Sequence, residues 1–179
     1  MPLRPHLLTR SFAALIALTG CVAQADDAAV LPGEIANATF TGTEYGAVTL
    51  TDGVWEGEPW VPGGAARPRV GLARDFLRRG DIDGDGADEA LVILWQSSGG
   101  SGTFNYIALV DEVDGAWRNT ATAALGDRVR VTDAAIGPHG VTVQVIEHDE
   151  DDPACCPTRA ATRRYDNRLT PLPETENES

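Results

Sequence analysis

Carboxylates stand at alternating positions in residues 80–89 (GDIDGDGADE), with glycines between them. If Asp81 is position 1, acidic side chains fall at positions 1, 3, 5 and 9, and position 7 offers a backbone carbonyl. Ca²⁺ takes about six to eight oxygen ligands at about 2.3–2.6 Å from a flexible loop. The spacing therefore predicts a calcium site with the ligands Asp81, Asp83, Asp85, Ala87 and Glu89.

The loop does not fit an EF-hand. An EF-hand needs a bidentate Glu at position 12 and a helix after it. Position 12 is Val92, which lies in an apolar run, residues 90–95, typical of a buried strand. The alternative to a metal site is a solvated acidic turn, because Asp and Gly are common turn residues. We favour calcium, since carboxylates this close repel one another without a cation.

The amino terminus predicts export. Arg4 and Arg10 form a basic start, and the apolar core at residues 11–18 is too short for a membrane span of about 20 residues. Residues 1–20 are therefore interpreted as a signal peptide. The lipobox-like residues 18–21 (LTGC) favour a lipoprotein with an acylated Cys21.

Cleavage after residue 25 is the alternative, because residues 23–25 (AQA) fit ordinary secretion. Both routes lead to the bacterial cell envelope. The lipoprotein would be anchored through Cys21, with the periplasmic face of the outer membrane as the expected place. The alternative product would be soluble in the periplasm.

Export leaves Cys155 and Cys156 in an oxidising compartment. Adjacent Cα atoms lie about 3.8 Å apart, below the usual 4.4–6.8 Å of a disulfide. We favour a vicinal disulfide that stiffens residues 149–157. Reduced buried thiols, an intermolecular bridge and a soft-metal site stay open, although a zinc site would need a second pair of ligands.

The charge of the chain excludes one class of partner. The 179 residues contain no lysine and have a formal net charge of −13. Removal of residues 1–20 takes two arginines and no acid, so the mature charge is 12 − 27 = −15. Such a surface repels nucleic acid and anionic lipid headgroups. We therefore expect no nucleic-acid role and no membrane contact except through the anchor at Cys21.

The remaining pattern is mostly β. We interpret residues 21–34 as a linker, 35–172 as one domain and 173–179 as a disordered polar tail. Alternating or continuous apolar runs bounded by Gly, Pro and Asp turns predict an antiparallel β-rich domain of about seven or eight short strands with little helix. The expected strands are residues 38–41, 47–51, 70–79, 90–95, 104–110, 129–131, 141–146 and 158–165.

The Gly/Ser segment at residues 97–103 joins two expected strands. Glycine backbones can form an anion nest, but the segment lacks the Lys of a P-loop and no helix follows it. A flexible hairpin connection is favoured. Because it is next to the acidic loop by connectivity, the segment is also a candidate to line a recognition surface.

The sequence predicts no catalytic constellation. Only His139 and His148 remain after export. His139 stands in a turn, and His148 stands in residues 147–152, an acidic run interpreted as a solvated loop or a contributor to a second cation site. No serine has an identifiable base and orienting acid.

Two resemblances add to these observations. The acidic loop resembles the D-x-D-G-D-G-x-x-[DE] loops of FG-GAP and integrin-type repeats, which lead into a strand. Those loops repeat around a propeller, whereas this chain has one copy, so a propeller is not expected. The resemblance implies that residues 70–79, ambiguous between helix and strand, form the strand before the loop.

The chain also resembles a group of bacterial exported proteins through four blocks in the same order. The blocks are GDIDGDG (80–86), GGSGTF (99–104), LGDR (125–128) and CCPT (155–158). Asp83 stands where Asn is common in that group, and it still offers an oxygen. The resemblance implies a shared fold and an envelope location, and it implies no activity.

Three functions follow, in order of preference. The first is a noncatalytic envelope lipoprotein or periplasmic protein with one structural Ca²⁺ loop. The second is a binding or assembly module for a glycan, a wall polymer or a partner protein, with Trp55 and Trp60 as contacts because they lie in a loop-rich region. Trp95 is expected in the core. The third is an acid-dependent hydrolase, whose paired carboxylates need no fixed sequence spacing.

Overall fold

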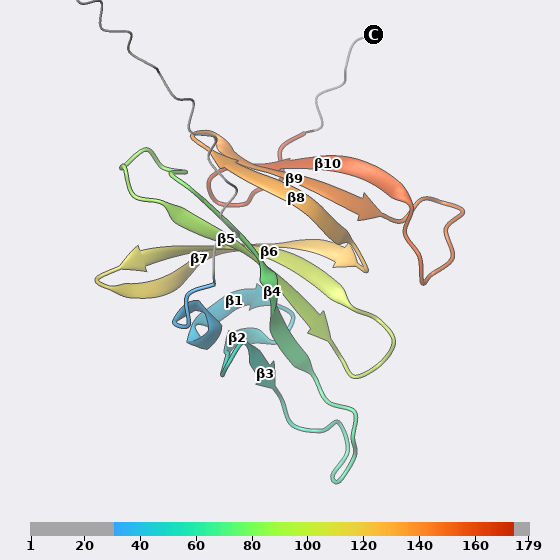
Figure 1. Cartoon of the computed structure of the whole chain (residues 1–179). Helices are drawn as coiled ribbons and strands as arrows, with labels where there is room; N and C mark the ends of the chain where they lie inside the picture. Colours follow the sequence, from blue (N-terminus) through green and yellow to red (C-terminus); the bar gives the residue numbers. More distant parts are fainter. Residues whose placement is uncertain (1–30, 174–179) are drawn as a thin grey trace, which may run out of the picture.

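A computed structural model describes residues 31–173, which form three antiparallel sheets. The central sheet has the strand order β3-β4-β5-β6-β7, a second sheet has the order β10-β9-β8, and β1 pairs with β2 (Figure 1). A short 3-10 helix, Ile35–Asn37, precedes β1. The strands are β1 Thr39–Thr43, β2 Gly46–Thr49, β3 Val54–Glu56, β4 Arg69–Gly80, β5 Glu89–Ser97, β6 Phe104–Val113, β7 Ala116–Asp127, β8 Arg130–Gly137, β9 Gly140–Glu147 and β10 Arg159–Tyr165.

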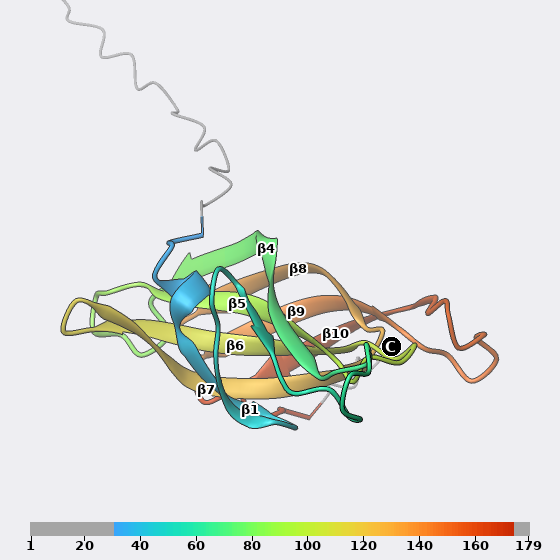
Figure 2. The same ribbon diagram turned by 90° about the horizontal axis from the view of Figure 1, so that it is seen from below.

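The sheets stack in three layers, and the central sheet is covered on both faces (Figures 1 and 2). One core lies between the central sheet and the β1–β2 hairpin, where Phe40 and Leu50 pack against Val92 and Leu94. The other core lies between the central sheet and β8–β10. Burial on both faces explains the continuous apolar run of β5, since its side chains point alternately to the two cores.

The expected fold class is confirmed, because the regular secondary structure of the described residues is antiparallel strand apart from one short 3-10 helix. The ambiguous residues 70–79 are strand, as expected, within β4. A register shift between Leu72 and Leu77 marks an irregularity in this strand opposite β5. β4 delivers the chain to the acidic loop, and β5 leads away from it.

Two strands were missed from the sequence, so residues 31–173 form ten strands rather than seven or eight. β3 has only three residues, and β7 (AWRNTATAALGD) is rich in small Ala and Thr and has few large apolar residues. The side chain of Asn119 shows why β7 is fixed in place. Its Nδ2 donates to the carbonyl of Leu109, and its Oδ1 accepts the N–H of Thr41 at 2.9 Å.

Gln96 is a buried polar residue that connects the central sheet to the β1–β2 turn. Its side chain is 1% exposed. Its Nε2 donates to Glu44 Oε2 at 2.7 Å, and its Oε1 accepts the Glu44 N–H at 3.2 Å and the Tyr106 hydroxyl at 3.3 Å. All of its polar groups therefore have partners, which a buried amide requires.

We expect Gln96→Ala to lower the free energy of unfolding by about 2–4 kcal/mol, because it removes these bonds and opens a cavity. Urea unfolding measures the change. Ser97→Ala, at the next and partly exposed position, should change stability by less than about 0.5 kcal/mol. A loss below about 1 kcal/mol for Gln96→Ala would mean that the turn is held by other contacts.

Candidate metal centre

The acidic loop is the connection of the β4–β5 hairpin. Gly80 and Glu89 are paired across the two strands, and residues 81–88 form the turn. Ile82, the second residue of the loop, is 4% exposed and packs in the core between the central sheet and β8–β10. Burial of Ile82 anchors the loop on the fold, while most of the other loop residues stay at the surface.

Side-chain carboxylates accept hydrogen bonds from the backbone of this loop. Asp81 Oδ1 accepts the Gly84 N–H at 2.6 Å, and its Oδ2 accepts the Gly86 N–H at 3.1 Å. Asp83 Oδ1 accepts the Asp85 N–H at 3.1 Å. Gly84 and Gly86 have φ values of 81° and 91°, a region that glycine reaches without steric cost. The two glycines therefore let the chain fold around Asp81.

Glu89 is the buried carboxylate of the site. Its side chain is 5% exposed, and Oε2 accepts the Ile82 N–H at 2.8 Å. Burial raises the pKa of Glu89, the bond from Ile82 opposes this, and the nearby charges of Asp83 and Asp111 raise the pKa further. Without a neutralising cation, the ionised form of Glu89 is thus disfavoured in the folded protein.

The structure brings three of the four predicted carboxylate ligands together. One carboxylate oxygen from each of Asp81, Asp83 and Glu89 lies within 4.8 Å of the other two. Asp85 is not in this group, and its Oδ1 accepts the Ala87 N–H at 2.7 Å. The arrangement offers three hard oxygen ligands at one point, which suits a divalent cation such as Ca²⁺ or Mg²⁺.

Comparisons with known proteins assign no family to this site. No protein-family model matches the chain, and no curated protein and no solved structure matches it. Within residues 31–173, no helix combines the length and the apolar character that a membrane crossing needs.

The tryptophans expected at a partner surface differ in exposure. Trp60 is 58% exposed, and its Nε1 donates to the Ser98 carbonyl at 2.6 Å. Trp55 is only partly exposed and packs on Tyr45, with ring centroids 5.6 Å apart. Trp95, expected in the core, is half-buried rather than fully enclosed. Trp60 is therefore the better surface candidate.

The Gly/Ser segment at residues 97–103 does form the hairpin connection between β5 and β6. Its expected position next to the acidic loop was wrong. The acidic loop precedes Glu89 and the segment follows Gln96, so the length of β5 separates them, about 25–30 Å at about 3.3 Å per residue. Adjacency along the chain does not bring the two ends of an extended strand together.

The segment is instead attached to the β7–β8 turn. Thr103 N–H donates to Asp127 Oδ1 at 3.0 Å, and Arg128 Nη2 donates to the Ser101 carbonyl at 2.7 Å. The GGSGTF and LGDR blocks are therefore one hydrogen-bonded unit in space. Their separation in the sequence gave no signal of this contact.

Cys155 and Cys156 form a disulfide at an exposed loop between β9 and β10. Cys21, residues 1–20 and most of the expected linker lie outside the described residues, as do residues 174–179 of the expected tail. Nothing in the structure bears on those segments.

Sequence reasoning misplaced Glu147, which was assigned to a solvated acidic run. Glu147 is 7% exposed and forms ion pairs with Arg159 and Arg163. Arg163 Nη1 also donates to the Leu125 carbonyl at 2.6 Å. A long-range network of this kind has no local sequence signal, because its partners come from three different strands.

Asp152 organises the loop that carries the disulfide. Its Oδ2 accepts the N–H groups of Asp149 and Thr158 at 2.8 and 2.7 Å, and its Oδ1 accepts the Thr158 hydroxyl at 2.7 Å. These bonds, that from Asp149 first, lower the pKa of Asp152. A group with a lowered folded pKa stabilises the fold above its unfolded pKa, and this contribution is lost as pH falls through the folded value.

We expect Asp152→Asn to reduce the acid-side loss of stability, since the amide does not titrate. Urea unfolding between pH 5 and pH 2 measures the slope for both proteins. Asp151→Asn, at the exposed neighbouring position, is the control and should keep the wild-type slope. Equal slopes for wild type and Asp152→Asn would show that Asp152 does not govern the acid response of this loop.

Proposed function

We propose that the chain is a noncatalytic protein of the bacterial cell envelope, lipid-anchored or periplasmic, in which the β4–β5 loop binds one structural Ca²⁺. The observation that carries the proposal is the buried carboxylate of Glu89 beside Asp81 and Asp83. A buried carboxylate near two others is costly when ionised and becomes favourable when a divalent cation neutralises the group.

The connection of the loop to the core supports a structural role for the cation. Ile82 and Glu89 are both buried, and a backbone-to-carboxylate hydrogen bond joins them. An ion on Glu89 would fix the start of β5, which is the middle strand of the central sheet. Loss of the ion would loosen the β4–β5 hairpin at the start of β5, next to the first residues of this strand that are buried in the two cores.

Thermal unfolding in the presence of Ca²⁺, Mg²⁺ or a chelator tests the proposal. At a hundredfold excess over Kd, Ca²⁺ should add about 2.7 kcal/mol, which corresponds to a rise in Tm of roughly 5–10 °C for a domain of this size. We expect a much smaller response to Mg²⁺, which demands octahedral geometry and dehydrates reluctantly. An unchanged Tm at millimolar Ca²⁺ would mean that the loop is an acidic turn and binds no structural Ca²⁺.

A second candidate function is an envelope binding or assembly module that recognises a glycan, a wall polymer or a partner protein. The observation that favours it is the exposed Trp60, whose Nε1 donates to the Ser98 carbonyl of the Gly/Ser segment. Trp60→Ala should abolish saturable binding to the cognate envelope glycan in a titration across glycans and peptidoglycan fragments. Flat titrations with the wild-type protein across that panel would count against this function.

A further inference from the structure

The sheet β8–β10 has an open edge at β10. β10 pairs with β9 on one side. On its other side only the carboxyl end is covered, where the Leu172 N–H donates to the Arg164 carbonyl at 2.8 Å and Tyr165 forms an isolated bridge with Pro171. Within residues 31–173, no strand lies against the preceding part of that edge. Open edges present unpaired backbone groups that can pair with another chain.

The covered end shows which backbone groups face outward. The carbonyl of Arg164 points to the open side, because it accepts from Leu172. Backbone groups of alternate residues in a strand face the same neighbour. Ala160 and Thr162 therefore direct their N–H and C=O groups to the open side as well. These groups form a regular set of donors and acceptors for one further strand.

A groove follows this edge. It has a volume of about 700 Å³ and is lined by Ala124 of β7, the whole of β10 and the segment Pro171 to Leu172. Because residues from both faces of β10 line it, the groove follows the edge of the strand rather than one face. The small side chains of Ala124, Ala160 and Ala161 leave room for a second backbone to approach.

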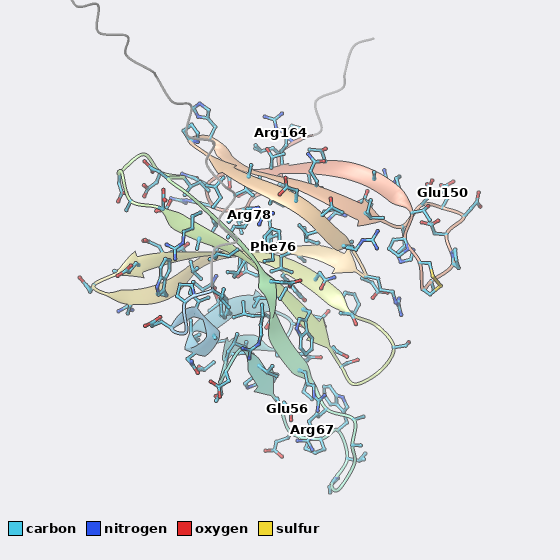
Figure 3. The ribbon with its side chains drawn as sticks, viewed as in Figure 1. Glu56, Arg67, Phe76, Arg78, Glu150 and Arg164 are labelled. Atoms are coloured by element: carbon cyan, nitrogen blue, oxygen red, sulfur yellow. A yellow bond between two sulfur atoms is a disulfide. The ribbon has the colours of Figure 1, made fainter. Side chains whose placement is uncertain are left out.

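The charge of β10 is opposite to that of the chain. The strand carries Arg159, Arg163 and Arg164, whereas the whole chain has a formal charge of −13. Arg159 and Arg163 share the carboxylate of Glu147. Within the described residues no carboxylate pairs with Arg164, which Figure 3 places at the sheet surface away from the central sheet. The edge therefore keeps a net positive charge of two, 3 − 1 = 2.

We propose that the open edge of β10 binds an extended acidic peptide segment of a partner protein, which adds to the sheet β8–β10 as a fourth strand. Main-chain hydrogen bonds to Ala160 and Thr162 would supply affinity, and carboxylates near Arg164 would select acidic sequences. A second copy of β10 is a poor occupant, since two such strands would bring six arginines together. This surface is separate from the calcium loop, so either proposal can fail without the other.

Fluorescence anisotropy with a labelled peptide tests the interaction. The probe alternates glutamate and valine over about seven residues, the length of β10, and has blocked termini. We expect saturable binding that weakens as salt is added. A probe with lysine in place of glutamate should bind at least about tenfold more weakly. A probe with alternate backbone amides N-methylated keeps the charge but cannot pair, and it should lose binding.

Two variants separate strand pairing from charge. Thr162→Pro removes one outward N–H while leaving the ladder with β9 intact, and it should weaken binding about tenfold or more. Thr162→Ala keeps the N–H, loses only the hydroxyl bond to Gln144 and should bind like wild type. Arg164→Gln should weaken binding about three- to tenfold, and Arg168→Gln, at an exposed turn outside the groove, should change it less than twofold.

Several results would overturn the proposal. Equal affinity of the N-methylated and parent probes would mean that charge alone attracts the peptide, and this comparison holds even if Thr162→Pro fails to fold. No saturable binding would leave the edge without this partner. A dimer in sedimentation that Arg164→Gln strengthens would assign the edge to a second copy. Probe binding only after deletion of residues 174–179 would assign it to the chain's own tail.

Discussion

We expect Glu89→Gln to abolish the proposed stabilisation by Ca²⁺ and to be no less stable than the wild-type protein when Ca²⁺ is removed. The two effects have opposite signs because the carboxylate has two environments. With Ca²⁺ in the proposed site, the charge of Glu89 would be the negative ligand nearest the core. Without one, burial raises the pKa of Glu89 and disfavours the ionised form. The neutral amide removes both the attraction of the carboxylate to the cation and the cost of burying its charge.

The sizes of the two effects can be compared directly. In Ca²⁺ at a hundredfold excess over Kd, the variant should be about 2.7 kcal/mol less stable than wild type. In chelator it should be equal to wild type or more stable by up to about 1 kcal/mol, since Gln can still accept the Ile82 N–H that Glu89 Oε2 accepts in the structure. Urea unfolding in both conditions measures these differences.

Asp88→Asn is the matched control, because Asp88 is adjacent, exposed and outside the carboxylate group. It should keep most of the Ca²⁺ response. A wild-type Ca²⁺ response in Glu89→Gln would remove Glu89 from the ligand set. A loss of several kcal/mol in chelator would instead mean that the ionised carboxylate is itself needed to hold Ile82.

Gly140→Ala will destabilise the protein by about 3–5 kcal/mol, although it adds one methyl group in a surface hairpin. Gly140 has a φ of 128°, which an L side chain rarely adopts. A Cβ at this position would also overlap the backbone carbonyl of Tyr165 and come within 3.0 Å of Asp166 Cα. Neither Tyr165 nor Asp166 can shift without disturbing the sheet, because the end of β10 pairs there with the start of β9.

Gly137→Ala tests whether this effect is local to Gly140. Both glycines belong to the β8–β9 turn, but a Cβ at Gly137 would meet nothing within 4 Å. Gly137→Ala should therefore change stability by less than about 1 kcal/mol and can increase it. Thermal unfolding of both variants gives the comparison. Similar losses in the two proteins would mean that turn flexibility, and not the approach of β10, governs this position.

Local pattern was enough to find eight of the ten strands and the fold class. The apolar run of β5 and the alternation in β9 are properties of neighbouring residues, and they survive in the structure. The same is true of the turn glycines in the acidic loop. β7 was missed because it is rich in Ala and Thr and only Leu125 among its residues is fully buried, so its apolar pattern is weak.

At the candidate site, too, the sequence predicted what depends on neighbouring residues and missed what depends on distant ones. The spacing of the acidic residues placed Asp81, Asp83 and Glu89 near one point, because the loop is short and its two glycines allow the chain to turn around Asp81. It could not show that Asp85 bonds the Ala87 N–H instead, nor that Glu89 is buried. Burial depends on which sheet covers the hairpin, and that covering comes from residues far along the chain.

Strand positions, turns, the acidic loop and the charge of the chain are therefore readable from sequence, since each depends on residues a few positions apart. The folding of the chain into three layers fixed the rest. It buried Glu147 between two arginines, joined Asp127 to the Gly/Ser segment and left β10 with an open cationic edge. Each of these depends on the pairing and stacking of distant strands, which are set by register and packing across the whole domain.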